Sequence, residues 1–381
     1  MTPRQTQGNN SRITTYILSV SCIILLITSL VLGSQLFILT RFIPASDNGI
    51  KQLIASQYWA SIPTDNEYRE AQLSGLVAAL KDPYSEYVTK SDREKLTDSL
   101  NRRYEGVGIQ FDFSGTSIKV VKTIPGSPAE AADVKKDDIL SKVDSVDVKT
   151  LKNDEILSRI RGVEGSSVEL EFLREGQSII KNIKRAKILT ELITLEVKGD
   201  TGVITINSFG ENLDSKMQTI TNSIRANSSI NNLIIDVRDD GGGLLNESVE
   251  VISYFLPAKT LILQEKSKSE TTELFSKSKS PSLANYPLQV LINGNTASAS
   301  EILAGSLRDQ RGVKLIGQKS FGKGVVQKLF PLNNGDSLKL TVAEWLTPKG
   351  NQINSIGLEP DIIVEANKDA LDVALANRPN L

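Results

Sequence analysis

Residues 288–301, LQVLINGNTASASE, decide the fold class, because they run from a strand through a turn directly into a helix. The run 288–292 is almost wholly apolar and has the length of a strand buried on both faces. The Ser-Ala-Ser-Glu at 298–301 fits a capping box, which marks the start of a helix. A strand that leads straight into a helix is the repeating unit of parallel α/β sheets, and their sites lie at these strand ends.

The sequence on both sides continues this alternation of strand and helix. Strands are predicted at 202–208, 232–237, 260–263 and 288–292, and helices at 213–226, after Gly243 and at 298–309. We therefore predict an α/β core at residues 188–368, followed by a C-terminal tail at 369–381. The hydrophilic stretch 266–281 is predicted to be a solvated surface connection.

Two further blocks precede this core. Residues 44–100 have a helical pattern. Between residues 70 and 80, apolar residues recur at intervals of three and four positions, and Pro83 is predicted to end the helix. Residues 101–187 contain short strands and two helices, at 128–133 and 153–161, and we interpret them as an independent small β-rich domain. The expected class is therefore a multi-domain α/β protein.

The N-terminal region, 1–43, contains an uncharged run at residues 13–40. Its apolar part, 16–39, is long enough to cross a ~30 Å hydrocarbon core as a helix. It is longer than a usual signal-peptide core, and no clean cleavage site follows. We predict a short cytoplasmic tail and a single-pass transmembrane anchor, with the body of the protein outside the cytoplasm. Whether the helix is cleaved stays open.

The composition excludes several classes of function. Lys and Arg number 44 against 45 Asp and Glu, so the net charge of −1 argues against a nucleic-acid partner. The 381 residues include no histidine, which removes Ser-His-Asp triads and His-ligated zinc. The single cysteine, Cys22, permits neither an intrachain disulfide nor a cysteine-only zinc site. No metal or organic cofactor is predicted, and a general base must be Asp, Glu, Lys, Tyr or an α-amine.

Three elements of the core contain candidate catalytic groups. Ser298 is predicted at a helix start, where free amides and the helix dipole would stabilise an oxyanion, although taken alone this motif favours a helix cap, which needs no chemistry. The glycines at 241–243 follow a strand. Either their backbone N–H groups form an oxyanion hole, or the segment is a plain flexible turn. Lys323 lies between two glycines, where burial would lower its pKa and make it a base, or it is a surface charge. Gln327 lies four residues further on and could orient that amine.

In this order the elements resemble those of the carboxy-terminal processing peptidases, also called tail-specific proteases. The stretches that carry the resemblance are LVAALKDPYSEYV, YEGVGIQF, PGSPAEAA, LIIDVRDDGGG, TASASEILAGSLRD, FGKGVVQ and TVAEWLTPKGNQINSIGLEPDIIV. In that family the nucleophilic serine precedes the lysine by 25 positions, and 323 − 25 = 298 selects Ser298 over Ser300. The resemblance implies that Ser298 is the nucleophile, Lys323 the general base and Gln327 its orienting group. It assigns the oxyanion hole to the backbone N–H groups of Gly243 and Ala299.

The same resemblance implies a PDZ-like domain at 101–187 and a crotonase/ClpP-like α/β protease core. A PDZ domain binds C-terminal peptides by strand addition. Gly106, Val107, Gly108 and Ile109 match its carboxylate-binding loop, and Arg161 matches an arginine that couples peptide binding to the active site. Two departures occur: Asp133 and Asp137 replace glycines, and Arg-Asp-Asp at 238–240 stands where Arg-Asn-Asn or Arg-Asn-Pro is usual.

We therefore expect a membrane-anchored serine endopeptidase whose partners are protein substrates, bound by their C-terminal peptides. A homo-oligomer or a regulatory adaptor is left open. One alternative is a catalytically silent PDZ adaptor. Another is a crotonase-like acyl-CoA enzyme, against which the Ser–Lys spacing, the PDZ-like block and the apolar N-terminal segment count.

Overall fold

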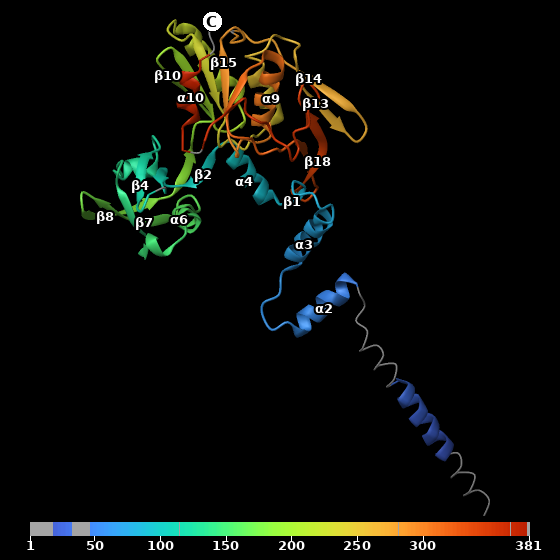
Figure 1. Cartoon of the computed structure of the whole chain (residues 1–381). Helices are drawn as coiled ribbons and strands as arrows, with labels where there is room; N and C mark the ends of the chain where they lie inside the picture. Colours follow the sequence, from blue (N-terminus) through green and yellow to red (C-terminus); the bar gives the residue numbers. More distant parts are fainter. Residues whose placement is uncertain (1–17, 33–45, 114, 281, 366, 379–381) are drawn as a thin grey trace, which may run out of the picture. The chain divides into compact units, whose positions relative to one another are not determined.

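The computed structural model describes residues 18–32, 46–113, 115–280, 282–365 and 367–378 (Figure 1). By compactness the chain divides into two units, Met1–Leu73 and Ser74–Leu381, which are described separately. In the first unit, residues 18–32 are helical, and α2 (Asp47–Gln57) begins at Ser46, whose hydroxyl accepts the Gly49 N–H at 3.2 Å. Helix α3 (Asp65–Ala78) begins after Thr64, whose hydroxyl accepts the Glu67 N–H while the Glu67 carboxylate accepts the Thr64 N–H.

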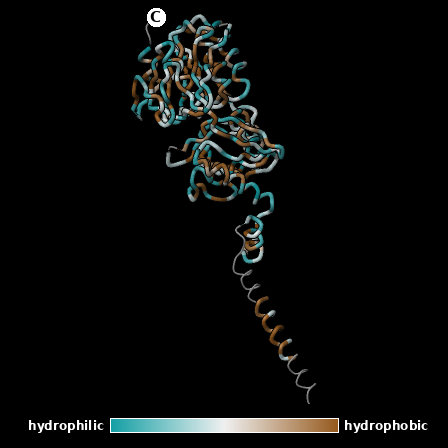
Figure 2. The backbone as a smooth tube through the Cα atoms, turned by 90° about the vertical axis from the view of Figure 1, so that its right-hand side faces the viewer, coloured by the Kyte–Doolittle hydropathy of each residue, from teal (hydrophilic) through white to brown (hydrophobic). Residues whose placement is uncertain are grey.

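The predicted transmembrane segment, 16–39, falls only partly on described residues. Residues 18–32 form a helix whose apolar side chains are exposed, and Figure 2 shows this helix as largely hydrophobic with short polar interruptions. Residues 16–17 and 33–39 lie outside the described part of the chain. Among the helices that are described, none reaches the length and apolar character needed to cross a bilayer.

The second unit contains a six-stranded sheet in the order β10-β11-β12-β15-β16-β19. Strand β10 runs antiparallel to β11, and the other neighbours are parallel. The strands are β10 (Ile193–Lys198), β11 (Thr201–Ile206), β12 (Asn232–Asp236), β15 (Leu288–Ile292), β16 (Lys314–Gly317) and β19 (Ile362–Ile363). The strands predicted at 202–208, 232–237 and 288–292 lie in this sheet, whereas the one predicted at 260–263 falls in β13 (Leu261–Ser267), which belongs to a different sheet.

Helices cover both faces of this sheet because its strands carry apolar residues on both sides. One face packs into the main core with helices α7 (Leu213–Ala226), α8 (Leu245–Ile252) and α9 (Ala299–Arg311). The opposite face packs on α10 (Ala370–Ala376). Neighbouring residues Ile234 and Ile235 of β12 illustrate the division, since the first lies in the α10 cluster and the second in the main core. Burial on both faces fixes the parallel strand ends that carry the candidate site.

A second sheet is built around the ten-residue strand β18 (Ser337–Leu346). One edge of β18 pairs with β17 (Val325–Pro331). Its other edge pairs with β1 (Glu86–Val88) near its start and with β13 (Leu261–Ser267) near its end, and β14 (Thr271–Phe275) pairs with β13. Strand β1 interrupts the predicted helical segment 44–100, and the β13–β14 hairpin replaces most of the predicted connection at 266–281. Helix α4 (Lys90–Leu100) follows β1 and is capped by Thr89.

The β-rich block forms its own sheet, in the order β3-β4-β5-β7-β8 with β6 on β5. Its strands are β3 (Ile109–Asp112), β4 (Ile118–Thr123), β5 (Ile139–Val143), β6 (Val146–Asp147), β7 (Ser167–Arg174) and β8 (Gln177–Lys184). Helices α5 (Pro128–Ala131) and α6 (Asn153–Ile160) and a 3-10 turn, η1 (Val148–Thr150), complete the block around a separate core. Strand β2 (Arg103–Gly106) leads into it and pairs with β9 (Ala186–Leu189), which leads out.

Candidate active site

Ser298 lies at the turn between β15 and α9 in a strained backbone conformation. Its φ of 56° and ψ of −115° fall outside the regions that non-glycine residues favour. The helix caps Ser46, Thr89 and Ser127 instead have φ of −113°, −65° and −79°, the extended backbone typical of an N-cap. A capping role does not require strain, so the backbone favours a chemical role for Ser298. Ser300 is wholly buried, whereas Ser298 lines a cavity.

The glycine loop after β12 packs directly against this turn. Gly242 and Gly243 have φ of 99° and 149°, values that glycine tolerates far better than other residues. A Cβ at Gly242 would lie 2.8 Å from the Ala299 nitrogen, and one at Gly243 would lie 2.4 Å from the Phe209 carbonyl oxygen. Only glycine therefore allows the loop backbone to approach Ser298 so closely.

The amides of Gly243 and Ala299 are both available at this place. A bridge joins the glycine loop to Phe209, whose N–H donates to Gly242 O and whose carbonyl accepts the Leu244 N–H. The Gly243 N–H takes no part in these two hydrogen bonds. Ala299 is the first residue of α9, so its N–H has no acceptor within the helix and lies at the positive end of the helix dipole. Both residues line the cavity that Ser298 lines.

Polar contacts tie the glycine loop to the β15–α9 turn. The Asp239 carboxylate accepts the side-chain amides of Asn293 and Asn295, each at 2.8 Å. These hydrogen bonds hold the pKa of Asp239 below its usual value. The backbone carbonyl of Asp240 accepts the Ala297 N–H at 3.1 Å. The two segments are therefore fixed relative to each other before any substrate binds.

Glu301 joins this turn to the loop that carries Lys323. The side chain is fully buried, and its carboxylate accepts four hydrogen bonds. One oxygen accepts the Ser298 and Lys323 N–H groups, each at 2.9 Å. The other accepts the Ser320 hydroxyl at 2.5 Å and the Gly322 N–H at 2.8 Å. The two chain segments that carry the candidate nucleophile and base thus share one buried anchor.

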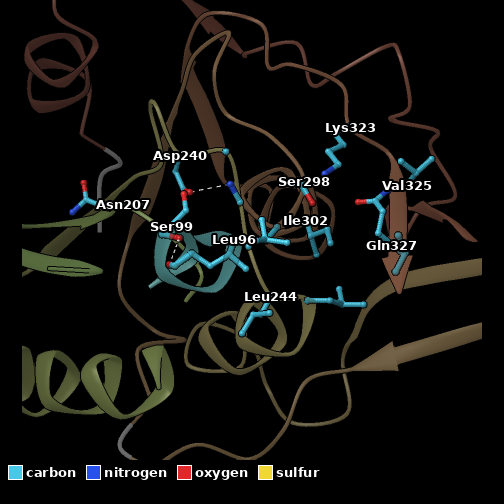
Figure 3. Close-up of a pocket in the computed structure, with 18 of the residues that line it drawn as sticks. Leu96, Ser99, Asn207, Asp240, Leu244, Ser298, Ile302, Lys323, Val325 and Gln327 are labelled. Atoms are coloured by element: carbon cyan, nitrogen blue, oxygen red, sulfur yellow. Dashed lines mark hydrogen bonds between the residues drawn. The ribbon is translucent and has the colours of Figure 1, made fainter. Parts of the chain in front are cut away.

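Lys323 has the environment of a general base. Figure 3 shows its side chain pointing towards Ser298 across the cavity. Between these two described side chains the structure forms no direct hydrogen bond, and such contacts often tighten only when substrate binds. Burial lowers the pKa of Lys323, the nearby Lys339 ammonium lowers it further, and Glu301 and Glu86 oppose the shift. The Tyr84 ring lies over the amine, with Nζ 5.0 Å from the ring centroid.

Gln327 lies on β17 and lines the same cavity (Figure 3). Its side-chain amide donates to the Thr341 hydroxyl at a long 3.4 Å. Thr341 is its register partner on β18, and a bulge at Val326/Gln327 breaks the regular pairing beside it. The structure therefore brings Gln327 into the site and holds it through Thr341.

Asp240 is a buried acid in the wall of this cavity. One oxygen accepts the Gly242 N–H at 2.9 Å, and the other has no hydrogen-bond partner among the described residues. Burial raises the pKa of Asp240 to about 7, against the opposing effects of the Gly242 N–H, Ser300 and Arg102. The glycine loop is therefore held by a carboxyl group that changes charge near neutral pH.

One cavity of about 480 Å³ brings the predicted catalytic residues together. Its lining includes Ser298, Ala299, Lys323, Gln327, Gly243, Asp240 and Lys339. Apolar side chains line it as well, among them Leu96, Leu244, Ile302 and Val325 (Figure 3). Trp345 also belongs to this lining. A polar catalytic end within a partly apolar pocket suits the binding of an extended peptide.

The predicted peptide-binding residues lie in the β-rich block, outside this cavity. Gly106 ends β2, Ile109 begins β3, and the Val107 side chain is buried in the core of the block. Gly108 has a φ of 81°, and a Cβ there would lie 2.3 Å from the Ser127 Cβ. Arg161 follows α6, and its guanidinium lies 5.5 Å from the ring centroid of Tyr104 on β2. Backbone groups of 106–109 are therefore the candidates for contact with a peptide.

Sequence reasoning missed several residues of the site. Glu301 was interpreted only as part of a capping box, and Asp240 only as a departure from the usual motif. Tyr84, Thr341 and Lys339 were not singled out. The stretches KDPYSEYV and TVAEWL, which both carry the family resemblance, were the signals that could have directed attention to the first two of these three.

Comparisons with known proteins identify the regions that contain the cavity and the β-rich block. Residues 200–364 match the model for peptidase family S41, and residues 119–174 match a PDZ domain model. A protein of Staphylococcus aureus strain N315, described as a "Probable CtpA-like serine protease", is 32% identical over 321 residues, which are 84% of this chain and 64% of that protein. The chain thus spans less than two thirds of the length of this relative.

Solved structures show the same fold. The photosystem II D1 C-terminal processing protease has a TM-score of 0.52 and 24% identity, over 84% of this chain and 87% of that one. A protein of Bacteroides fragilis described as a "Putative S41 protease" has a TM-score of 0.55 and 16% identity, over the same shares of the two chains. At these identities the likeness concerns the fold alone. Taken together, residues 200–364 match peptidase family S41, residues 119–174 match a PDZ domain, and over 84% of its length the chain is similar to a CtpA-like serine protease.

Proposed function

We propose that this protein is a membrane-anchored serine endopeptidase that recognises the C-terminal tails of proteins through its PDZ domain. One observation carries the catalytic part of the proposal. Ser298, on a strained turn, faces a lysine of lowered pKa in a cavity that also contains the Gly243 and Ala299 amides. This arrangement supplies a nucleophile, a base and two donors for an oxyanion without histidine.

In the acylation step, the neutral Lys323 amine accepts the proton of the Ser298 hydroxyl as its oxygen attacks the substrate carbonyl carbon. The carbonyl oxygen becomes an oxyanion, which the Gly243 and Ala299 N–H groups stabilise. The tetrahedral intermediate then collapses, the C–N bond breaks, and the Lys323 ammonium returns the proton to the leaving amine. The product is an ester of Ser298 and a released C-terminal fragment.

In the deacylation step, Lys323 accepts a proton from a water molecule that attacks the ester. The C–O bond to Ser298 breaks, and the proton returns to the serine oxygen. Gln327 orients the amine through both steps, held in turn by Thr341. Because the amine must be neutral, the rate is expected to fall on the acid side as Lys323 becomes protonated. Its lowered pKa extends activity to lower pH than an ordinary lysine allows.

Cleavage of an unfolded reporter by the full chain in detergent tests this mechanism. Two reporters are compared, identical except that one ends in a free carboxylate and the other in an amide. Wild type, Ser298→Ala and Lys323→Ala are assayed with both. We expect cleavage by the wild type alone, faster on the free carboxylate, and a loss of at least about 10⁴-fold in each variant.

The other results of this assay are also informative. Cleavage by Ser298→Ala at the wild-type rate would contradict the assignment of the nucleophile. Tail binding without cleavage by the wild type would favour a silent PDZ adaptor. Equal rates on the two reporters would contradict recognition of the terminal carboxylate while leaving the peptidase mechanism intact.

Membrane anchoring and the extracytoplasmic position of the body are further parts of the proposal. They are supported by the exposed apolar side chains of the helical residues 18–32 and by the uncharged run 13–40. A Cys22→Ser background with Ser269→Cys in the exposed β13–β14 hairpin tests the orientation. We expect a membrane-impermeant maleimide to label intact cells at position 269. Labelling only after lysis would place the body in the cytoplasm.

A further inference from the structure

A second lysine, Lys339, lines the same cavity as Ser298 and Lys323. The mechanism above does not use it. Its side chain is 22% exposed, so most of it is withdrawn from water. Two ammonium groups in one small cavity repel each other, and the repulsion is greater where water is partly excluded.

Strand register explains why Lys339 reaches this cavity. Lys339 and Thr341 are two residues apart on β18, so they lie on one face of the strand. Thr341 is the register partner and hydrogen-bond partner of Gln327, which fixes that face towards the site. On the other edge of β18, Glu86 of β1 lies directly opposite Lys339 and forms an ion pair with it.

The chain before β1 completes this side of the site. Pro83 is preceded by Asp82, whose carboxylate accepts the Tyr84 N–H at 3.1 Å and the Ser85 hydroxyl at 2.5 Å. The Ser85 hydroxyl oxygen in turn accepts the Thr341 N–H at 3.0 Å. This turn places the Tyr84 ring over Lys323 and Glu86 beside Lys339.

We propose that Lys339, held by Glu86, is an electrostatic positioning residue for the general base, and that its ammonium keeps the Lys323 amine neutral. The inference rests on the proposed Ser298–Lys323 mechanism. It gives the Lys339–Glu86 pair a role in the chemistry, although neither residue touches the reacting atoms.

Lys339 and Glu86 shift the pKa of Lys323 in opposite directions and by unequal amounts. Lys339 favours the neutral amine, and Glu86 favours the ammonium. Glu86 is 56% exposed, against 22% for Lys339, so water and salt screen its charge more. The other groups facing Lys323 are Glu301 on α9, which favours the ammonium, and the neutral Tyr84 ring. Because the better-shielded charge belongs to Lys339, the pair favours the neutral form overall.

The pH dependence of kcat/KM tests the proposal. The full chain in detergent is assayed from pH 6 to 10 on a peptide that has no titrating group in this range. The variants are Lys339→Gln, Glu86→Gln and Lys339→Arg. A matched control is Lys216→Gln, which removes an exposed lysine paired with Glu191 at 3.0 Å. Thermal unfolding of each variant is measured alongside.

The expected shifts have opposite directions for the two partners. Lys339→Gln removes the repelling charge and leaves Glu86 unpaired, so the acid limb moves to higher pH. The rate is then several-fold lower near neutral pH and approaches the wild-type plateau at high pH. Glu86→Gln moves the acid limb to lower pH. Lys339→Arg and Lys216→Gln leave the limb in place.

A purely structural role predicts a different pattern, in which both partners lower the rate equally at every pH. That result, or a shift in the same direction for both variants, would overturn the proposal. If Lys339→Gln does not fold, the downward shift in Glu86→Gln and the unchanged limb of Lys339→Arg still decide the question. Failure of the proposed function is distinct, because then the wild type does not cleave or Lys323→Ala retains activity.

Discussion

The two sides of the active site are built by different means. The nucleophile side consists of the Ser298 turn and the glycine loop, which follow adjacent parallel strands of a sheet buried on both faces. Buried hydrogen bonds and glycine contacts fix it. The base side consists of Lys323, Gln327 and Lys339, which lie on or beside the half-exposed second sheet, with Glu86 as an ion-pair partner at the surface.

Under the proposed mechanism, this difference assigns two separate requirements of catalysis to two parts of the fold. Attack and oxyanion binding need fixed geometry, which a close-packed interior provides. The protonation state of an amine depends on charge and hydration, which a partly exposed sheet can adjust with single residues. Substitutions on the first side should therefore alter stability and rate together, and those on the second side mainly the rate and its pH dependence.

The largest effect is expected where the two sides meet, at Glu301. Each carboxylate oxygen of Glu301 accepts two hydrogen bonds, and Glu301→Gln replaces one of these oxygens by an NH₂ group. Because NH₂ is a donor, the two buried groups that donated to that oxygen lose their acceptor. We expect a loss of about 3–5 kcal/mol in the free energy of unfolding and a large fall in kcat. Urea denaturation measures the first effect. Glu359→Gln, at an exposed ion pair, is the control and should change stability by less than about 0.5 kcal/mol.

Asp240→Asn tests whether the nucleophile side contains a titrating group. The pKa of the Asp240 carboxyl is near its ordinary value of 3.8 in the unfolded chain and about 7 in the folded one, so folding disfavours ionisation. The wild type should therefore lose stability as the pH rises from about 4 to 7, by up to about 4 kcal/mol, and then level off. The asparagine variant should lack this loss. Parallel pH–stability curves for the two proteins would contradict a raised pKa.

Ser298→Gly tests the strain on the same side. The Ser298→Gly variant lacks the hydroxyl and should be inactive. Because glycine adopts the observed φ of 56° and ψ of −115° readily, it should be more stable than Ser298→Ala by about 1 kcal/mol. The higher melting temperature relative to Ser298→Ala is the measurement, since neither variant has the hydroxyl. Equal melting temperatures would mean that the turn stores no strain.

The smallest effect is expected at Thr341 on the base side. Its hydrogen bond to Gln327 is long, at 3.4 Å, so Thr341→Val should lower kcat by no more than about fivefold, equivalent to about 1 kcal/mol. Stability should hardly change. A loss as large as that of Lys323→Ala would show that Gln327 depends on Thr341 far more than this geometry indicates.

The sequence predicted the nucleophile side better than the base side for a physical reason. Helix α7 buries one face at helical spacing, strands β12 and β15 are short runs buried on both faces, and the turn into α9 at Ser298 follows from an adjacent capping pattern. Strands β1, β17 and β18 are half-exposed, mix apolar and charged residues, and pair across large separations in sequence. No local pattern identifies such partners.

Individual residues show the same limit. The 298–301 capping pattern indicated the contact of Glu301 with the Ser298 N–H, but its other three donors come from 320–323, which a local motif does not reveal. Pro83 was interpreted as a helix stop, and it does follow α3, yet the turn around it also places Tyr84 over Lys323. The raised pKa of Asp240 follows from burial, which depends on the whole fold.

The pairing of β1 with β18 also determines when the enzyme becomes complete during synthesis. The hydrogen bond from the Thr341 N–H to Ser85 joins residues 256 positions apart. At about 5–20 residues per second, roughly 13–50 s separate the synthesis of these two partners. The β-rich block lies entirely between them and can fold in that interval. A growing chain therefore presents its folded PDZ-like block before Lys323 has its surrounding wall, so the proposed peptide binding arises before the proposed proteolysis.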